Sequence, residues 1–316
     1  MSNPKCEESR QSYIDKNPFD GFTIDDNSIL EKLEGRHPCP KCGKSRKFYC
    51  YSCYVPILEL EGKLPKVKLP FKIDIIKHKH EIDGKSTAGH AAILANDNVT
   101  IYIYPNIPDY DEENVVLIFP SQNAISVSQL VNGCNYEEML KYQQESLDKL
   151  PKGYNKSTLM KIIPKTRQEY EFNVKAKKLP ITKAVFIDST WNQSKGIYKD
   201  ERIKKITCVV IQNRISQFWR HQKGSPRWYL ATVEAIHQFL IEVHLHLWGL
   251  NPNYNGIKNC FTEKRLSQFK CLYNTDVLAY NGQYDNLLYF FQHMYDLIHK
   301  YYNHEELYAY KRRLMY

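Results

Sequence analysis

The pattern of apolar and polar positions predicts a series of buried strands. Runs that are rich in β-branched and aromatic residues, and that end at polar or Pro-containing stretches, are typical of strands. Such runs lie at 71–78 (FKIDIIKH), 99–105 (VTIYIYP), 115–120 (VVLIFP), 184–191 (AVFIDSTW) and 207–212 (TCVVIQ). In the first run Phe71, Ile73 and Ile75 alternate with Lys72 and Asp74, which predicts one apolar and one polar face. The third run is almost entirely apolar, which indicates a strand that is buried on both faces.

Three other stretches show helical spacing. Residues 86–95 (STAGHAAILA) predict a short helix with Ser86 or Thr87 as its N-cap. Residues 232–250 and a last helix that begins near Gln283 each carry an apolar stripe, which we expect to face the core. The stripe residues are Val233, Ile236, Phe239, Leu240, Val243 and Leu247, and then Leu287, Leu288, Phe291, Tyr295 and Ile298. Because strands alternate with helices, the sequence predicts an α/β fold with a mainly parallel sheet, whose ligands bind beyond the carboxyl ends of the strands.

The same patterns divide the chain into regions. Residues 1–36 mix acids, Asn, Ser and Pro without a sustained period and predict a flexible leader. Residues 37–56 hold a cysteine cluster, and 57–305 form the large domain. We interpret 122–180 as a basic insertion within that domain, because the strand pattern resumes after it. The insertion includes one stretch with amphipathic helical spacing at 136–150, and its basic residues could touch phosphates or form a solvated linker.

Composition adds information on partners and compartment. The 316 residues carry a net charge of +9, which favours anionic partners such as nucleic acid. The 24 tyrosines suit a surface that contacts bases, or they reflect a compositional bias of the source. The amino-terminal segment is polar and lacks the apolar core of a secretory signal, and the longest apolar run is too short to span a bilayer. We therefore expect a soluble, intracellular protein that is neither secreted nor bound to a membrane.

Four of the nine cysteines form two Cys-x2-Cys pairs with seven residues between them. These are Cys39, Cys42, Cys50 and Cys53. Two such pairs place four thiolates on tight turns, which predicts a structural zinc ribbon; an iron–sulfur site or free thiols are the alternatives. Cations and aromatic residues around the pairs suit an RNA surface or are ordinary exposed side chains. The other cysteines are scattered, as expected in a reducing compartment.

An unusual polar group ends the fourth strand run. Asp188, Ser189, Thr190 and Trp191 lie where the ligands of a parallel sheet bind. By contrast, the segment GKST at 84–87 is no phosphate-binding P-loop, because position 79 holds a lysine where that motif needs glycine. The histidines of the long helix, His237, His244 and His246, are expected to be structural.

The segment FIDSTWNQ (186–193), with its Asp-x-Thr-Trp core, resembles the signature of the DTW-domain proteins, which are tRNA-uridine aminocarboxypropyltransferases. Other segments resemble that family in the same order, from about residue 37 to 302, interrupted by the insertion. They are FYCYSCYVP, KLPFKIDIIKH, DGKSTAGHA, VVLIFPS, FWRHQKG, LATVEAI and GQYDNLLYFFQHMYDLI.

The resemblance implies transfer of the 3-amino-3-carboxypropyl group from S-adenosylmethionine to ring nitrogen 3 of a tRNA uridine in the D-loop, with release of 5′-methylthioadenosine. It implies that 57–305 form a catalytic domain related to SPOUT methyltransferases, with a carboxyl-terminal trefoil knot. The implied partner is tRNA, and no obligate protein partner is inferred. The branch of the family that the chain most resembles implies a nuclear location, with the cytoplasm as the alternative.

The resemblance also gives roles to individual residues. Asp188 is the candidate to accept or orient the imide proton of uridine, although an Asp after a strand can simply cap the turn. Residues expected to contact S-adenosylmethionine are Phe119, Pro120, Ser121, Thr190, Trp191, Leu230, Thr232 and Glu234. Thr232 could instead cap the long helix, and Trp191 could belong to the core. Candidates for contacts with the substrate carboxylate or with tRNA are Lys85, Arg220, His221 and Lys223, with Arg227 as a further phosphate contact.

Two other functions fit the same residues. An S-adenosylmethionine-dependent RNA methyltransferase would use the same pocket with a different orientation of the donor. A non-catalytic zinc-ribbon RNA-binding adaptor would need no reaction at Asp188.

Overall fold

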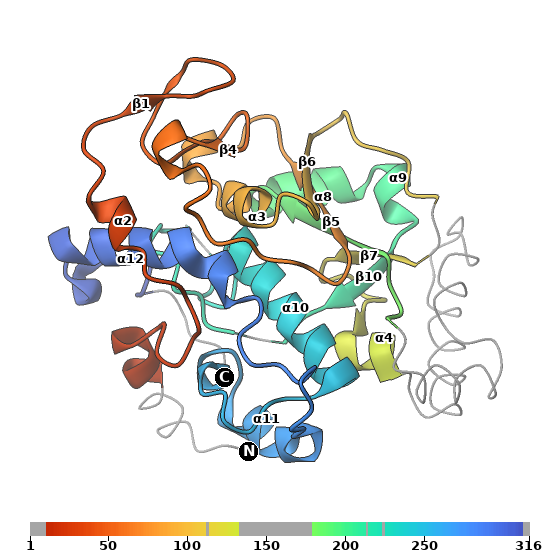
Figure 1. Cartoon of the computed structure of the whole chain (residues 1–316). Coiled ribbons are helices and arrows are strands. Elements are labelled where there is room, and N and C mark those ends of the chain that lie inside the picture. The colour runs from red at the N-terminus through yellow and green to blue at the C-terminus, as the bar shows by residue number, and fades with distance from the viewer. Residues whose placement is uncertain (1–10, 112–113, 133–178, 213, 223–224, 312–316) are drawn as a thin grey trace.

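The chain folds around a six-stranded sheet (Figure 1). The computed structural model describes residues 11–111, 114–132, 179–212, 214–222 and 225–311. The strands lie in the order β6–β5–β9–β7–β10–β8, and every neighbouring pair is parallel. Their bounds are Val99–Ile103 (β6), Lys72–Lys77 (β5), Lys183–Asp188 (β9), Val115–Ile118 (β7), Thr207–Val210 (β10) and Ile125–Ser126 (β8). The predicted strands and the mainly parallel α/β fold are confirmed.

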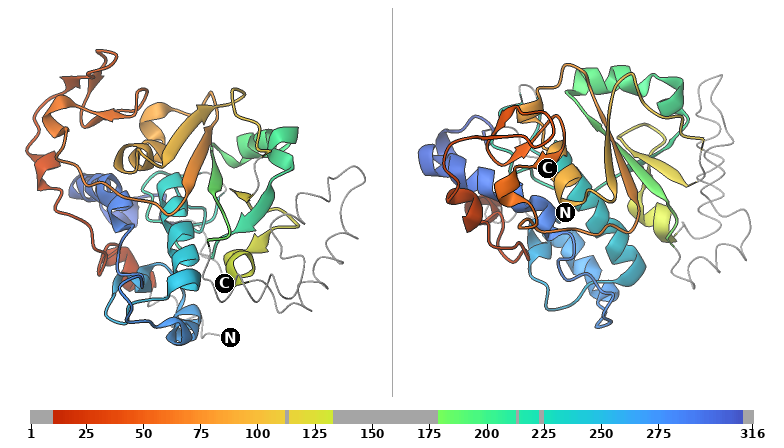
Figure 2. Two further views of the ribbon diagram at one scale, coloured as in Figure 1. Left: turned by 45° about the vertical axis from the view of Figure 1, so that its right-hand side comes forward. Right: turned by 45° about the horizontal axis from the view of Figure 1, so that its top comes forward.

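Helices cover both faces of the sheet, which explains why most side chains in the middle of its central strands are apolar and buried. On one face α3 (Ala88–Leu94), α4 (Val127–Asn132) and α10 (Thr232–Trp248) pack on the sheet, and α12 (Tyr289–Tyr301) packs outside them. On the other face lie α8 (Trp191–Tyr198) and α9 (Glu201–Lys204). Figure 2 shows the cyan α10 and the green α8 and α9 on opposite sides of the sheet.

Shorter elements complete the described part of the chain. Two small hairpins pair β1 (His37–Pro38) with β2 (Ser45–Arg46), and β3 (Tyr49–Cys50) with β4 (Val55–Pro56). The remaining helices are α2 (Ser28–Glu31), α11 (Glu263–Gln268) and the 3-10 turns η1 (Leu58–Leu60), η2 (Asp83–Lys85), η3 (Gly256–Asn259), η4 (Phe269–Leu272), η5 (Asp285–Leu288) and η6 (His304–Glu306). Within the described ranges, no helix combines the length and the apolar character needed to cross a membrane.

The structure differs from the predicted leader and insertion. Residues 11–36 pack against the body of the protein: Leu30 is fully buried, and the Phe19 ring lies edge-on to that of Phe291. A few isolated apolar side chains anchor this segment, so no periodic pattern marks it. At the start of the predicted insertion, β8 pairs with β10 and α4 packs on α10. Residues 133–178, with the helix predicted at 136–150, lie outside the described residues.

The polar face predicted for the first strand is also buried. Asp74 is only 3% exposed, because the layer of α8 and α9 covers that face of the sheet. The Lys183 ammonium lies 3.4 Å from the Asp74 carboxylate and compensates its charge. The alternation of apolar and polar residues therefore predicted the strand β5 correctly, but the face that carries Asp74 is buried and not exposed to solvent.

The last helix starts later than predicted, at Tyr289. The preceding η5 turn holds Asp285, whose buried carboxylate accepts hydrogen bonds from His237, Tyr254 and Tyr280. His237 is thus a satisfied structural histidine, and so is His244, whose ring nitrogens contact Tyr284 and a main-chain carbonyl. The structural interpretation of these two histidines is confirmed.

Phe239 joins α10 to the sheet, because its fully buried ring lies edge-on to those of Phe71 and Phe186. We predict that Phe239→Ala lowers the free energy of unfolding by about 3–5 kcal/mol, since the substitution loses burial and leaves a cavity. Val277→Ala is the control: this side chain is 90% exposed, and its effect should stay within about 0.5 kcal/mol. Urea unfolding followed by circular dichroism measures both values. Equal stability of the two variants would contradict this role of Phe239.

Candidate functional site

The carboxyl ends of the parallel strands meet at one edge of the sheet, and Asp188 lies at its centre. Asp188 is the last residue of β9, and β9 lies between β5 and β7. The register places Lys77, the last residue of β5, beside Asp188. This is the edge at which ligands of open parallel sheets bind, as the sequence predicted.

The Asp188 carboxylate connects three segments that are far apart in the sequence. Its Oδ2 accepts a hydrogen bond of 2.6 Å from the Ser86 hydroxyl, and its Oδ1 accepts one from the Thr232 hydroxyl. Ser86 precedes α3, and its oxygen also accepts a bond from the Ala88 N–H. Of the two predicted caps, Thr87 occupies the N-cap position, but its side chain makes no capping hydrogen bond to α3. Thr232 opens α10, but its hydroxyl donates to Asp188 instead of capping the helix. One carboxylate therefore fixes the starts of two helices against the end of β9.

Burial shapes the proton affinity of this group. Asp188 is 5% exposed, and its loss of hydration raises the pKa of the carboxyl above its usual range. The hydrogen bonds from Ser86 and Thr232 and the charge of Lys77 oppose this increase without cancelling it. Lys77 is itself buried, and its ammonium pairs with Asp83. The site thus holds a carboxylate that takes up a proton more readily than a surface Asp does.

Three aromatic side chains form a wall next to Asp188. The Trp191 ring lies 4.3 Å from the Tyr229 ring and 6.2 Å from the Phe119 ring, between ring centres. Phe119 in turn stacks on Tyr198 of α8 at 4.7 Å. Thr190 caps α8, because its N–H donates to the Gln193 side chain at 3.0 Å. Trp191 is half-buried and contacts Tyr229 and Phe119, so it belongs to this wall of the site and not to the core.

The other residues expected to contact S-adenosylmethionine differ in their environments. Pro120 is exposed, and Ser121 and Leu230 are half-buried. Glu234 is fully buried, and its carboxylate accepts hydrogen bonds from the Ser216 hydroxyl and from main-chain N–H groups of residues 217 and 231. Both of its oxygens therefore bind the chain itself. The structure does not support a direct contact of Glu234 with a donor molecule, and it makes Glu234 an anchor of the loop before α10.

The candidate RNA contacts also separate into groups. Lys85 and His221 are exposed, as a contact with tRNA would require, and Lys223 lies outside the described residues. Arg220 is half-buried and donates to the Gly84 carbonyl at 3.4 Å, in the loop that carries Ser86. Burial lowers its pKa, and among the described residues its Nε has no hydrogen-bond partner.

The expected phosphate contact of Arg227 is wrong. Arg227 is 2% exposed, and both terminal nitrogens of its guanidinium donate to the Asp15 carboxylate. Asp15 lies in residues 1–36, which the sequence predicted to be a flexible leader, so the pattern of residues gave no sign of this pair.

Sequence reasoning missed two further residues of the site, Lys77 and Tyr229. Lys77 ends a strand run next to the one that ends in Asp188, which is a usable signal once the strand order is known. Tyr229 lies in a loop without a pattern and meets Trp191 only through the fold. Neither contact could be inferred from the order of residues.

The four clustered cysteines converge as predicted. Their sulfur atoms all lie within 4.8 Å of one another, and those of Cys42 and Cys50 are 3.7 Å apart. Gly43, after the first pair, has the positive φ of +68° that a tight turn favours. Burial raises the pKa of the Cys50 thiol, but hydrogen bonds from nearby N–H groups and from Arg46 have a larger effect in the opposite direction. The net result is a pKa lowered to about 6. The arrangement is compatible with a metal site.

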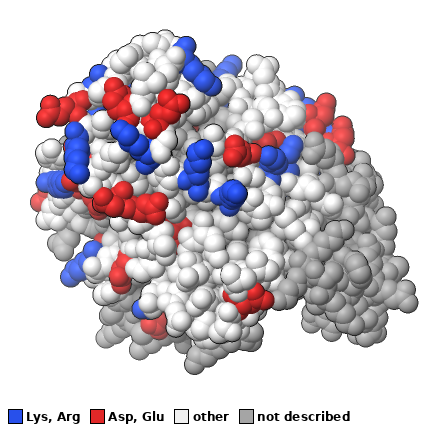
Figure 3. All heavy atoms as spheres, viewed as in Figure 1, with Lys and Arg blue, Asp and Glu red and all other residues white. Residues whose placement is uncertain are grey.

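The cysteine-bearing segment contacts both α12 and the loop before α3. The Tyr49 ring lies 4.9 Å from that of Phe290, and the Phe48 ring lies 5.0 Å from that of His293. Ser52 lies 3.5 Å from Asp83, which pairs with Lys77. Figure 3 shows Lys and Arg side chains gathered with Asp and Glu over the upper part of this face, so an anionic partner would meet mixed charge there.

Comparisons with known proteins identify the family of this chain. The model of the DTW domain matches residues 47–299, which include Asp188 and its partners Ser86 and Thr232. The chain is 37% identical over 323 residues to "tRNA-uridine aminocarboxypropyltransferase 1" of Xenopus tropicalis, covering 94% of this chain and 97% of that protein. It is 38% identical over 299 residues to the Homo sapiens protein of the same name, covering 91% and 86%. No solved structure matches. This chain therefore belongs to the DTW domain family.

Proposed function

We propose that this protein transfers the 3-amino-3-carboxypropyl group of S-adenosylmethionine to ring nitrogen 3 of a tRNA uridine. The observation that carries the proposal is the buried Asp188 carboxylate, bound by two hydroxyls at the carboxyl edge of the sheet. Relatives that match more than nine-tenths of this chain carry the name "tRNA-uridine aminocarboxypropyltransferase 1", which supports the transfer of this group to a tRNA uridine. In the reaction a new N–C bond forms at the γ-carbon of the donor, the C–S bond breaks, and its electron pair leaves with 5′-methylthioadenosine.

The residues of the site suit such a donor. Phe119, Trp191 and Tyr229 offer aromatic faces for an adenine ring, and cofactor pockets are mostly apolar with a few placed polar groups. Among the residues that the structure describes, none accepts a hydrogen bond from the Arg220 Nε, and the carboxylate of S-adenosylmethionine would supply an acceptor. We assign to Arg220 the binding of that carboxylate, and to Pro120, Ser121, Leu230 and Thr190 the rest of the pocket.

Asp188 would receive the proton that uridine loses. Because Ser86 and Thr232 cover the carboxylate, the imide proton would pass to a hydroxyl oxygen while that hydroxyl gives its own proton to Asp188. A carboxyl with a raised pKa is suited to accept a proton near neutral pH. The two hydroxyls would then act as positioning groups and as a relay.

We assign zinc to the cysteine cluster. In tetrahedral coordination with Zn–S bonds of about 2.3 Å, sulfur atoms lie about 3.8 Å apart. The separation of 3.7 Å between the Cys42 and Cys50 sulfurs fits this geometry, and four thiolates leave no open position for catalysis. The metal would therefore stabilise the segment that packs on α12 and supports the loop before α3.

The exposed Lys85 and His221 lie in the two loops that Arg220 connects, and we assign them contacts with tRNA. The target in the D-loop, the relation to SPOUT methyltransferases, the trefoil knot and a nuclear location stay predictions from the family resemblance.

Product analysis tests the proposed reaction. Incubation of the protein with tRNA and S-adenosylmethionine should yield 5′-methylthioadenosine and a uridine heavier by one aminocarboxypropyl group, both measured by mass spectrometry. A tRNA whose D-loop uridines are replaced by cytidine is the control. Formation of S-adenosylhomocysteine would contradict the proposal in favour of methyl transfer, and tRNA binding without a product would favour an adaptor.

The role of Asp188 can be tested with an isosteric change. Asp188→Asn removes the proton acceptor, so we predict that kcat falls by about 10²–10⁴-fold, the usual size of such a contribution. Asp200→Asn is the matched control, since Asp200 caps α9 and pairs with Arg202. Steady-state kinetics across pH should show that the acidic limb of the wild-type profile is lost in Asp188→Asn. An unchanged profile would exclude Asp188 as the acceptor.

The metal assignment gives a separate prediction. Purified protein should contain one zinc ion per chain, and Cys42→Ser should lower this content and the thermal stability, because one of four ligands is lost. Cys260→Ser is the control, since this buried cysteine lies outside the cluster. Elemental analysis by mass spectrometry measures the content. Equal zinc in both variants would place the metal elsewhere.

A further inference from the structure

We infer that Asp15, in the amino-terminal segment, is a positioning residue for the loop 214–231, and that it holds the described parts of this loop, 214–222 and 225–231, in the shape the site needs. This inference rests on the proposed function for what the loop does. Asp15 lies outside residues 47–299, which the DTW domain model matches. The loop therefore owes part of its shape to a segment that the domain signature does not include.

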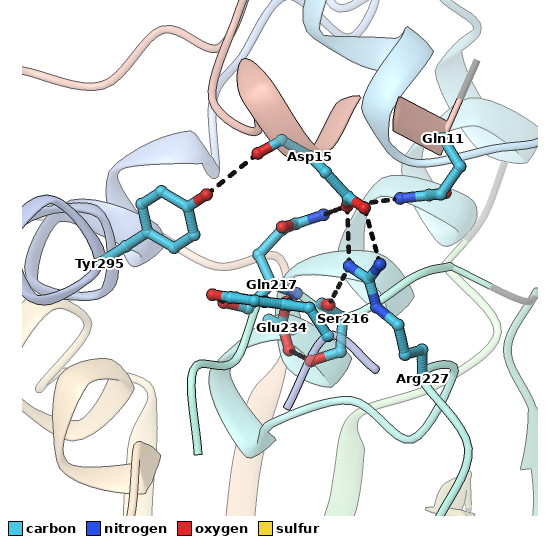
Figure 4. Close-up of polar contacts among 8 residues, drawn as sticks. Gln11, Asp15, Ser216, Gln217, Arg227, Glu234 and Tyr295 are labelled. Carbon is cyan, nitrogen blue, oxygen red and sulfur yellow. Dashed lines mark hydrogen bonds and ion pairs between the residues drawn. The ribbon is translucent and has the colours of Figure 1, made fainter. Parts of the chain in front are cut away.

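Asp15 is the centre of a dense set of hydrogen bonds (Figure 4). Its two carboxylate oxygens accept bonds of 2.7 Å each from the two terminal nitrogens of Arg227. Oδ1 also accepts a bond of 3.1 Å from the Gln217 side chain and one of 2.8 Å from the Gln11 side chain. Arg227 and Gln217 lie near opposite ends of the loop, so one carboxylate ties both ends to the helical residues 11–16.

The loop has a second anchor that is independent of Asp15. Glu234 of α10 binds the Ser216 hydroxyl at 2.6 Å and the Gln217 N–H at 2.8 Å. The main chains of residues 216 and 227 are also joined by a hydrogen bond of 2.8 Å. Because Glu234 also accepts a bond from the residue 231 N–H, it holds the main chain of the loop at both ends. The Arg227 guanidinium, in contrast, is oriented by Asp15, with one further bond to the Ser216 carbonyl.

The segment between these anchors reaches the candidate site. Arg220 donates to the Gly84 carbonyl next to the loop that carries Ser86, and the Tyr229 ring lies 4.3 Å from that of Trp191. Tyr229 is two residues after Arg227 in the chain. A displacement of the Arg227 side chain would therefore move the aromatic wall before it disturbed the Asp188 carboxylate.

The carboxyl-terminal segment closes the same cluster. The Tyr310 hydroxyl donates to the Gln217 carbonyl at 3.2 Å, and the Arg227 guanidinium lies 5.2 Å from the centre of the Tyr310 ring. The Tyr295 hydroxyl of α12 donates to the Asp15 carbonyl at 3.1 Å. With Arg227 2% exposed, the guanidinium needs a buried anion, and a bidentate carboxylate also fixes its orientation.

The chain offers a matched control for this contact. Glu31 pairs with Lys300 and also links the amino-terminal segment to α12, but both side chains of this pair are more than half exposed. Within the described residues, neither side chain forms a hydrogen bond or ion pair with loop 214–231 or with Asp188, and exposed pairs of this kind contribute little to stability. Glu31→Gln therefore removes a carboxylate from the same segment without touching the loop.

Kinetics and amide hydrogen exchange of the full-length zinc-loaded protein test the inference. Asp15→Asn should raise KM for S-adenosylmethionine about tenfold with a smaller change in kcat, because the wall is displaced while Asp188 is retained. Exchange of the amides in 214–231 should become faster, and that of β5, β7 and β9 should not change. Glu31→Gln should match the wild type in both measurements. Wild-type KM and exchange in Asp15→Asn would overturn the inference, as would faster exchange across the whole sheet.

A second variant keeps the test informative if an unpaired Arg227 unfolds the protein. The double variant Asp15→Asn, Arg227→Gln removes both charges, and we expect it to remain folded with fast exchange in 214–231. Wild-type exchange of the loop in a folded double variant would overturn the inference. Because exchange needs no substrate, it tests the role of Asp15 even if product analysis rejects aminocarboxypropyl transfer.

Discussion

The candidate site depends on one buried carboxylate at the end of a central strand. Parallel pairing brings the carboxyl ends of β5, β9 and β7 to one edge, and Asp188 uses that position to bind the Ser86 and Thr232 hydroxyls. A buried carboxylate is costly unless it is hydrogen-bonded, so the fold holds the starts of α3 and α10 close to it. The residual cost appears as a raised pKa, which is also the property a proton acceptor needs.

Around this centre the protein uses charge to order segments that lack a regular structure. Glu234 holds the loop before α10 from inside, and Asp15 holds it from the amino-terminal helix. The cysteine cluster acts at another boundary, because Tyr49 packs on Phe290 and Ser52 approaches the Asp83–Lys77 pair. The amino-terminal helical residues and the cysteine segment therefore stabilise loops that have no regular secondary structure of their own.

The sequence predicted those features that depend on local periodicity or on a compact motif. The runs that form β5, β9 and α10, and the converging sulfurs of Cys39 to Cys53, belong to this group. The sequence did not predict contacts between two residues that are far apart in the chain. Asp15 and Arg227 are 212 residues apart, and each alone has the pattern of a surface charge. Likewise, Thr232 had the pattern of a helix cap, and only the closure of the sheet edge showed that it binds Asp188.

The central claim is that S-adenosylmethionine binds at the carboxyl edge of the sheet, between the ends of β7 and β9 and the start of α10. Amide hydrogen exchange of the wild-type protein, with and without S-adenosylmethionine, tests this most directly. The account predicts that the donor slows exchange in three separate segments together, at 119–121, 189–191 and 230–234. Slower exchange in the cysteine segment alone, or in none of the three, would contradict it.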